Sequence, residues 1–476
     1  MDINKYEELQ KRNNLQMQRL KELNAYIEGM KETSQIVDPP VYMQKTPLGI
    51  LKYVYKRLVR KSISWFTRPY WAQQNLYNMQ LVNCLHDILK SNEEIMFQLN
   101  CISGNGEFFE NNQMNILKNN EPKVVQVVSS LNFGDAVGND VMAIKRALTE
   151  EGILTGIYAA NIHPKIPFGM AHPYSELPEL TENDIVIYHF ASEDPLAEQV
   201  KNLPCKKVLR YHNVTPPEFF RPYNQDATVN TTRGLKQVKE LAGFMDYAMV
   251  ASDFNKHDLL DMGYTCDMDV VPCLIPFKDY EQTPDASVIE TYKDGWTNIV
   301  FVGRIAPNKK FEDIIDAFAV YKEKYNPKSR LLLVGSYGEN DLYYLKLKKQ
   351  VEKKRIEDVI FTGHISFAAI LAYYKVADVF LCMSEHEGFC VPLVEAMYFE
   401  KPIIAYKSTA IPYTLGDAGM LLESKEPTYV ASKIYELVQS ESMQEEYISN
   451  AKRRLQDFQY NVVKEKIITC IKKYKN

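Results

Sequence analysis

The sequence predicts an α/β protein in which two doubly wound, parallel-sheet domains face each other behind a helical N-terminal extension. Three observations support this fold class. The chain has 476 residues, more than one hydrophobic core usually serves. Short apolar runs alternate with amphipathic stretches in two successive series, as in parallel sheets with crossover helices. The first 121 residues lack this alternation and instead show helical spacing.

The two series and their flanks define the expected domains. We expect the helical extension at residues 1–121, the first domain at 122–285, the second at 286–455, and a C-terminal helix at 456–476 that packs back on the first domain. The runs of the first series are Val124–Val128, Ile153–Tyr158, Ile185–Tyr188, Lys207–Tyr211 and Tyr247–Val250. Those of the second are Asn298–Gly303, Arg330–Gly335, Val359–Thr362, Val379–Met383 and Pro402–Tyr406. Ligands of such sheets bind beyond the carboxyl ends of the strands.

The extension holds two patterns, each with two interpretations. Residues 1–30 contain a heptad seam of about two repeats, which predicts either a homo-oligomer contact or a surface helix, because a coiled coil needs about three to four heptads. Residues 39–86 carry seven cations and no acidic residue, with Trp65 and Trp71 close by. A basic amphipathic helix followed by aromatics is typical of a segment on an anionic membrane surface. The alternative is a helical subdomain with solvated cations.

Composition excludes several classes of protein. The net charge of −5 and pI of about 6.0 argue against nucleic-acid binding. The eight cysteines form no metal-ligand or disulfide pattern, so we expect no metal site and a reducing compartment. With 46% hydrophobic and 25% charged residues the chain is a typical globular protein. No leader and no membrane-spanning run is recognised. We therefore expect a cytoplasmic protein, with the inner face of the membrane as the place where residues 39–86 would bind.

A glycine-containing turn follows the first strand of the first domain. Residues 132–140 include Gly134 and Gly138 and lead into an expected helix at Val141–Glu151. Glycine lets the backbone approach a ligand, and a helix N-terminus offers free N–H groups to an anion. Such a turn is often purely structural, so this signal is weak by itself.

The second domain opens with cations that suit a diphosphate. Gly303 and Arg304 follow the first expected strand, and Lys309 comes five residues later. Protein-supplied cations of this kind can neutralise a diphosphate where no metal is evident. An isolated Arg and Lys pair would more often be solvated surface charge.

The strongest signal is the segment 384–397, SEHEGFCVPLVEAM. Glu387 ends an apolar run, Gly388 permits a tight turn, and Glu395 lies about two helical turns further on. One carboxylate can therefore face a sugar while the other reaches ribose hydroxyls and the helix N-terminus receives phosphate.

From about Ser129 to Ala418 the chain resembles the family 4 glycosyltransferases, which have the GT-B fold of two facing Rossmann-like domains. Glu387 and Glu395 match the family's E-x7-E motif, within EGFCVPLVEAM. The resemblance implies that Arg304 and Lys309 bind the donor diphosphate, Glu387 contacts the transferred hexose and Glu395 holds the ribose. It also implies donor contacts from the following residues: Gly303, Gly335, His364, Gly388, Phe389, Cys390 and Val391. The turn after the first strand adds Gly138 as a further expected donor contact.

The family also has a histidine in its first domain that reaches the donor sugar. His212 matches it, with His189 as the competing candidate. Three positions depart from the family pattern: Cys390 and Lys310 stand where glycines are usual, and Tyr413 stands where glutamate is frequent. None of these removes a carboxylate or a phosphate-binding cation.

The expected function is thus a retaining, metal-independent hexosyltransferase that uses a UDP- or GDP-hexose and no other cofactor. Glu387, His212, Arg304 and Lys309 are its expected catalytic residues. The expected acceptor is a lipid-linked or cell-surface glycan of a bacterial polysaccharide. A sugar-nucleotide epimerase and a non-catalytic GT-B scaffold or glycan-binding protein are the alternatives, and fold alone does not separate them.

Overall fold

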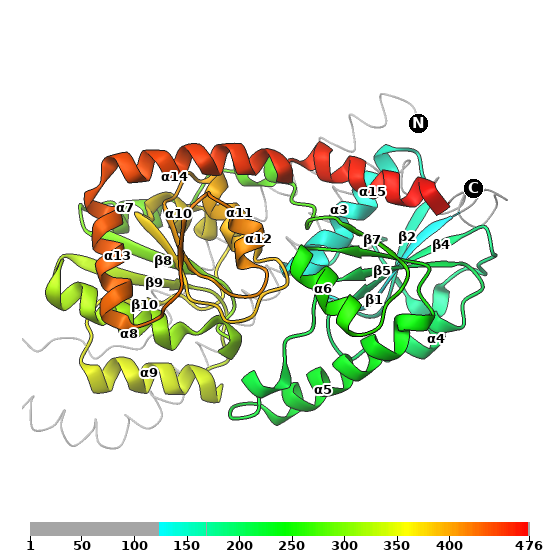
Figure 1. The fold of residues 1–476 in the computed structure, drawn as a ribbon, viewed down its shortest axis with the longest axis horizontal. Helices are drawn as coiled ribbons and strands as arrows, with labels where there is room; N and C mark the ends of the chain where they lie inside the picture. Colours follow the sequence, from blue (N-terminus) through cyan, green and yellow to red (C-terminus); the bar gives the residue numbers. More distant parts are fainter. Residues whose placement is uncertain (1–122, 168, 475–476) are drawn as a thin grey trace, which may run out of the picture. The chain divides into compact units, whose positions relative to one another are not determined.

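The structure is a computed structural model that describes residues 123–167 and 169–474. The seam at 1–30 and the basic segment at 39–86 lie outside these residues. Within them, two parallel sheets follow one another along the chain (Figure 1). No described helix is both long and apolar enough to cross a bilayer. The fold class predicted from the sequence, two Rossmann-like domains, is confirmed.

The first sheet has seven strands in the order β3-β2-β1-β4-β5-β6-β7. Its strands are β1 Val124–Leu131, β2 Thr155–Ile162, β3 His172–Pro173, β4 Ile185–Phe190, β5 Lys206–Tyr211, β6 Tyr247–Val250 and β7 Asp267–Val270. Its helices are α3 Ala136–Glu150, α4 Ala197–Lys201, α5 Gln225–Glu240 and α6 Asp253–Asp261. All adjacent strands run parallel, and the chain order reverses between β1 and β4. A ligand crevice is expected at such a switch point.

The second sheet has six strands in the order β10-β9-β8-β11-β12-β13. Its strands are β8 Thr297–Val302, β9 Ser329–Val334, β10 Val359–Phe361, β11 Val379–Cys382, β12 Ile403–Tyr406 and β13 Met420–Leu422. Its helices are α7 Ala286–Tyr292, α8 Phe311–Lys324, α9 Leu342–Lys354, α10 Phe367–Val376, α11 Val391–Tyr398, α12 Ile411–Leu415, α13 Pro427–Gln439 and α14 Glu441–Arg454. The switch point lies between β8 and β11.

Both faces of the first sheet are covered, because alternate residues of a strand point to opposite faces. Val186 and Tyr188 of β4 join a core with α4, α5 and α6, whereas Ile185 and Ile187 join a core with α3. The C-terminal helix α15, Tyr460–Tyr474, completes the second of these cores. It lies beside α3 (Figure 1), so the end of the chain packs on the first domain.

Three strands that the sequence did not predict, β3, β7 and β13, are short edge strands. In β7 exposed Asp267 and Asp269 stand on either side of buried Met268, and half-buried Val270 follows, so the strand offers no apolar run. The helix start predicted at Val141 is wrong: the helix expected at Val141–Glu151 begins at Ala136. The reason is Asp135, whose carboxylate caps the helix by accepting a hydrogen bond from Gly138 N–H at 2.6 Å.

Candidate active site

The predicted diphosphate lysine and the first motif carboxylate lie together beyond the second sheet. Lys309 Nζ donates to Glu387 Oε1 at 2.7 Å, and the side chains are 16% and 11% exposed. The lysine stem passes close to Gly303, where an added Cβ would lie 3.3 Å from Lys309 Cδ. Burial opposes the lysine charge, but the Glu387 carboxylate outweighs it and raises the pKa of Lys309. The lysine therefore stays cationic at this site.

Arg304 supplies a second cation at the same strand end. It is exposed and follows Gly303 by one residue after β8. Within residues 123–167 and 169–474 its guanidinium makes no hydrogen bond or ion pair. Its donors are thus available to an anionic ligand, whereas those of Lys309 are partly engaged by Glu387.

The turn between β11 and α11 offers backbone amides. Cys390 is the N-cap of α11, has a left-handed φ of 71° and makes no side-chain cap hydrogen bond. Phe389 and Cys390 are buried, and Gly388 and Val391 are half-buried. An uncapped helix N-terminus leaves N–H groups for an anion such as phosphate.

Cys390 and Lys310 share an unusual backbone conformation. Both stand where the resembling family usually has glycine, and both have positive φ, 71° and 51°. This region favours glycine, because a Cβ crowds the following carbonyl. At both positions the backbone thus has a conformation that glycine usually adopts, although the residues are a lysine and a cysteine. Lys310 Nζ pairs with Glu385 Oε2 at 3.0 Å, which contributes a compensating contact.

The second motif carboxylate, Glu395, is held by two phenols. Tyr374 Oη donates to Oε2 at 2.6 Å and Tyr280 Oη donates to Oε1 at 2.8 Å. Burial raises the pKa of Glu395, and the two hydroxyls oppose that rise. Each carboxylate oxygen has two lone pairs, so each keeps one further acceptor position for a ribose hydroxyl.

Two loops expected to border the nucleotide lie side by side. Gly335 follows β9 and pairs with Gly363, which follows β10, through an isolated antiparallel bridge. A Cβ on Gly335 would lie 2.0 Å from the Gly303 carbonyl oxygen, so only glycine fits between the loops after β8 and β9. His364 is exposed next to this bridge.

On the first domain, Gly138 is buried in the first turn of α3. A Cβ there would lie 2.1 Å from the Asn132 carbonyl oxygen. Close packing of the β1–α3 loop on its helix therefore accounts for this glycine, and no described geometry points it at a ligand.

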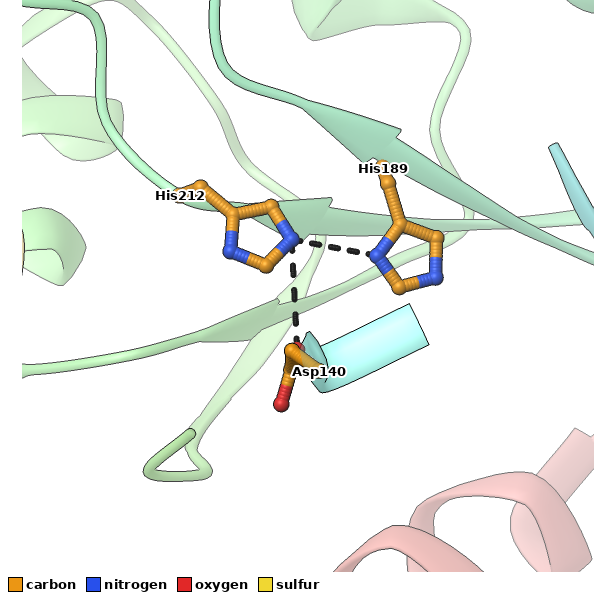
Figure 2. Close-up of side chains that lie close together, drawn as sticks. All are labelled: Asp140, His189 and His212. Carbon is orange, nitrogen blue, oxygen red and sulfur yellow. Dashed lines mark hydrogen bonds and ion pairs between the residues drawn. The ribbon is translucent and has the colours of Figure 1, made fainter. Parts of the chain in front are cut away.

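His212 and His189, which the sequence left as competing candidates, are neighbours. His189 is on β4 and His212 follows β5. Their Nδ1 and Nε2 atoms are 3.1 Å apart, and the ring planes are inclined by 17° (Figure 2). Burial is the main cause that lowers the pKa of His212 to about 4 and that of His189 well below its usual value. Both rings are therefore neutral at neutral pH.

A buried ion pair supports these rings. Asp140 of α3 lies 3.9 Å from His212 Nε2 and accepts a 2.8 Å hydrogen bond from Arg210 Nε. Burial would raise the pKa of Asp140, but Arg210 and His212 together hold it below its ordinary value. Arg210 also donates to the carbonyls of Val271 and Pro272. This pair is thus charged and fully hydrogen-bonded.

Asp140, His189 and His212 could by spacing hold a metal ion, since one ligand atom from each lies within 4.8 Å of the others. Their hydrogen bonds favour another arrangement. Oδ2 of Asp140 accepts from Arg210, and Oδ1 accepts from Leu274 N–H at 2.7 Å. A divalent cation would have to displace these donors beside a guanidinium, which Coulomb repulsion disfavours.

His212 of the first domain lies against the turn between β11 and α11 of the second domain. A Cβ on Gly388 would be 2.5 Å from the His212 carbonyl oxygen. Ser252 Oγ donates to the Gly388 carbonyl at 2.8 Å, and His386 Nε2 lies 2.7 Å from Asn213 Oδ1. Glycine at 388 therefore allows the two domains to meet at the turn that carries Glu387.

Sequence reasoning missed most of the supporting residues. Asn213 and His386 are 173 positions apart, and Asp140 and Arg210 are 70 apart. Asn213 has a left-handed φ of 76°, and its amide nitrogen donates to Asn255 at 3.0 Å. Only the position of Asn213 directly after His212 could have drawn notice in the sequence.

Comparison with known proteins finds similarity to glycosyltransferases. Residues 287–454 match the family described as Glycosyl transferases group 1. The chain is 22% identical over 259 residues to O-antigen chain mannosyltransferase B of Escherichia coli, covering 49% of this chain and 66% of that protein. It is 28% identical over 168 residues to the capsular polysaccharide biosynthesis glycosyltransferase CapM of Staphylococcus aureus, covering 33% and 41%. The matches thus span about two fifths to two thirds of these relatives.

Solved structures show the same fold. A sucrose-phosphate synthase from Thermosynechococcus elongatus aligns with a TM-score of 0.60 at 15% identity, covering 74% of this chain and 99% of that one. The Anabaena protein HepE, solved with UDP and glucose, aligns with a TM-score of 0.60 at 16% identity, covering 74% and 100%. The chain therefore has the GT-B fold and carries a glycosyltransferase group 1 domain, with homologues in bacterial polysaccharide biosynthesis.

Proposed function

We propose that the protein is a glycosyltransferase that transfers a hexose from a nucleoside-diphosphate sugar to a glycan or lipid-linked acceptor. The observation that carries this proposal is the Lys309 to Glu387 pair at 2.7 Å, next to the uncapped N-terminus of α11 and the first-domain His212. Cations and free amides suit the diphosphate, while a carboxylate and a neutral imidazole suit sugar hydroxyls.

The mechanism that we propose retains the anomeric configuration. In a front-face route an oxygen of the departing diphosphate assists removal of the acceptor proton while the sugar–phosphate bond breaks. Lys309 and Arg304 stabilise the negative charge that develops on the diphosphate. Charge stabilisation that increases toward the transition state raises the rate. The cations come from the protein, so we propose that no metal and no further cofactor is needed.

The test is a panel of UDP-, GDP- and ADP-sugars with the full-length chain. A true donor binds the folded state and raises the melting temperature in a concentration-dependent way. It also hydrolyses slowly without acceptor, and the sugar released or transferred keeps its anomeric configuration in NMR spectra. EDTA leaves the rate unchanged. Restoration by manganese after EDTA would contradict metal independence, and inversion would contradict the front-face route.

The same panel separates the alternatives. An epimerase would convert the sugar nucleotide into its epimer with no release of nucleoside diphosphate. A scaffold or glycan-binding protein would bind a glycan but neither bind nor consume any donor. Arg304, available to an anion, favours the transferase over the scaffold, because a scaffold needs no unpaired cation beside Lys309.

We also propose that residues 39–86 bring the enzyme to the inner face of an anionic membrane, where a lipid-linked acceptor resides. The support is their run of seven cations without an acid. Reversing Lys52, Lys56 and Arg60 to Glu in the full chain reduces sedimentation with anionic vesicles at low salt. The matched control reverses three exposed lysines of α9, Lys348, Lys349 and Lys353. Equal loss in both variants would show unspecific charge attraction.

A further inference from the structure

Four largely buried side chains form what is here called the histidine cluster: Gln126, His189, His212 and Asp140. Gln126 Oε1 lies 2.9 Å from His189 Nε2, and His189 Nδ1 lies 3.1 Å from His212 Nε2. Gln126 is fully buried, His189 is 2% exposed and the His212 side chain is 6% exposed. Water is thus largely excluded, and the protein itself determines which nitrogens carry protons.

The acceptors in this chain assign the tautomers. The Gln126 carbonyl oxygen can only accept, so His189 carries its proton on Nε2 and presents a lone pair on Nδ1. His212 then donates from Nε2 to that lone pair. The same His212 nitrogen faces Asp140 Oδ2 at 3.9 Å, a carboxylate that Arg210 keeps ionised. The lone pair of His189, which accepts the hydrogen bond, and the negative charge of Asp140 therefore both favour a proton on Nε2 of His212.

The other ring nitrogen of His212 is Nδ1. A neutral imidazole with Nε2–H has an unprotonated Nδ1, which accepts hydrogen bonds. In Figure 2 this second ring nitrogen points away from both His189 and Asp140. It makes no hydrogen bond within the part of the chain that the structure describes. The His212 carbonyl oxygen abuts Gly388, so the His212 backbone lies beside the turn that carries Glu387.

We infer that His189 is a positioning residue: together with Gln126 and Asp140 it holds His212 as the Nε2–H tautomer, so that Nδ1 accepts a hydrogen bond from a hydroxyl of the donor hexose. This inference rests on the proposed function and deepens it, because it gives His212 a defined role and gives His189, Gln126 and Asp140 a shared one. The near-parallel rings, inclined by 17°, suit an in-plane hydrogen bond between the two imidazoles.

The direct test reads the tautomer without any assay of activity. In the full-length chain labelled with 15N-histidine, long-range NMR correlations distinguish a protonated from an unprotonated ring nitrogen, and His212→Asn identifies the His212 signals. We expect His212 with an unprotonated Nδ1 and a protonated Nε2. A protonated Nδ1 on His212 overturns the inference. In His189→Leu, which removes one acceptor, the His212 signals shift toward a tautomer mixture.

The functional test separates positioning from general structural damage. His189→Leu lowers kcat/KM for the nucleotide sugar about tenfold, the effect of losing one oriented hydrogen bond. Affinity for the nucleoside diphosphate alone stays within about twofold, because that ligand binds Arg304, Lys309 and Glu395 of the other domain. His189→Asn, whose amide oxygen can replace Nδ1 as acceptor, restores most of the rate. The matched control is His257→Leu, at an exposed position.

Each outcome decides a different claim. Equal loss of nucleoside diphosphate affinity and of kcat/KM in His189→Leu would show a structural role only. Failure of His189→Asn to recover more rate than His189→Leu would overturn the acceptor role of Nδ1 of His189. If the wild-type protein binds and turns over no nucleotide sugar, the proposed function fails and with it the hexose contact, while the NMR experiment still decides the tautomer assignment.

Discussion

Lys309 combines an observed ion pair with a proposed role in binding the diphosphate. Its ammonium neutralises the mostly buried Glu387 carboxylate at 2.7 Å, and the proposed diphosphate would share the same charge. A cation can contact a carboxylate and a phosphate at once, because an ammonium has three donors. Arg304, one residue beyond Gly303, is exposed and keeps its donors for the ligand.

Lys309→Met should reduce kcat by about a hundredfold to a thousandfold, the usual cost of removing one preorganised charge partner of the transition state. It should also lower stability, because Glu387 is left unpaired. The control is Lys407→Met, which breaks an exposed ion pair with Glu423 and should leave kcat and stability unchanged. Adding Glu387→Gln to Lys309→Met should recover stability but not rate. Recovery of rate would contradict the assigned role of Lys309.

The left-handed conformation of Lys310 has a measurable consequence. At φ of 51° a Cβ is strained, so Lys310→Gly should be about 1 kcal/mol more stable than Lys310→Ala. Both variants lose the contact with Glu385 equally, and their difference therefore isolates the backbone. Urea denaturation of the two gives the comparison.

Lys348, exposed in the middle of α9, is the matched control for Lys310. At this position the order of stability should reverse: Lys348→Ala should be about 1 kcal/mol more stable than Lys348→Gly, because glycine weakens a helix interior. The same order at both positions would show that Lys310 is not constrained to the left-handed region in solution.

At the scale of elements, α15 joins the end of the chain to the start of the first domain. Its apolar face, which includes Val463, Ile467 and Ile471, is fully buried against α3 and the sheet. The cluster also holds Ile185 and Ile187 of β4, the strand on which His189 lies. Because Ile185, Ile187 and His189 are alternate residues of β4 and so point to one face, the helix packs on the same face of the sheet as the histidine cluster.

Ile467→Ala should therefore cost about 2–5 kcal/mol of unfolding free energy, as expected for truncation of a fully buried isoleucine. Val462→Ala on the same helix, where the side chain is 41% exposed, should change stability by less than about 0.5 kcal/mol. Thermal and urea unfolding of both variants check this. Similar losses in the two would mean that α15 does not dock in solution.

At the scale of the whole molecule, three buried histidines, His189, His212 and His386, link folding to pH. Burial lowers the pKa of His212 to about 4, and burial likewise lowers the pKa of His386 to about 4 despite the opposing charges of Glu387 and Glu218. The ordinary histidine value, which holds in the unfolded chain, is 6.5. His386 contacts Asn213, so its neutral form supports the meeting of the two domains.

The direction in which stability changes with pH follows from proton binding. Between pH 6.5 and about 4 the unfolded chain binds protons that the folded protein does not, so stability is fully present above pH 6.5 and falls as pH is lowered. Each histidine contributes a slope of at most about 1.4 kcal/mol per pH unit. His386→Gln, which keeps an amide donor toward Asn213, should remove one histidine's share of the slope. An unaltered slope in His386→Gln would contradict the shifted pKa.

Much of this protein could be predicted from local patterns. The ten expected apolar runs are strands of the two sheets, because a strand buried on both faces must be apolar along its length. The segment 384–397 indicated the glycosyltransferase resemblance, because its two carboxylates flank a turn with a glycine. The shift of α3 to Ala136 shows the limit of that approach, since a single cap at Asp135 determined where the helix begins.

The sequence by itself determined the fold class, the family resemblance and the residue types at the donor turn, because these depend on neighbours in the chain. Only the tertiary structure decided how His189 and His212 are related: they are two members of one cluster rather than alternatives. It also paired Lys309 with Glu387, placed Gly388 against His212 and joined Asp140 to Arg210. The last three of these contacts join residues 70 or more positions apart, and their geometry depends on how the strands are ordered within each sheet and where the two domains meet.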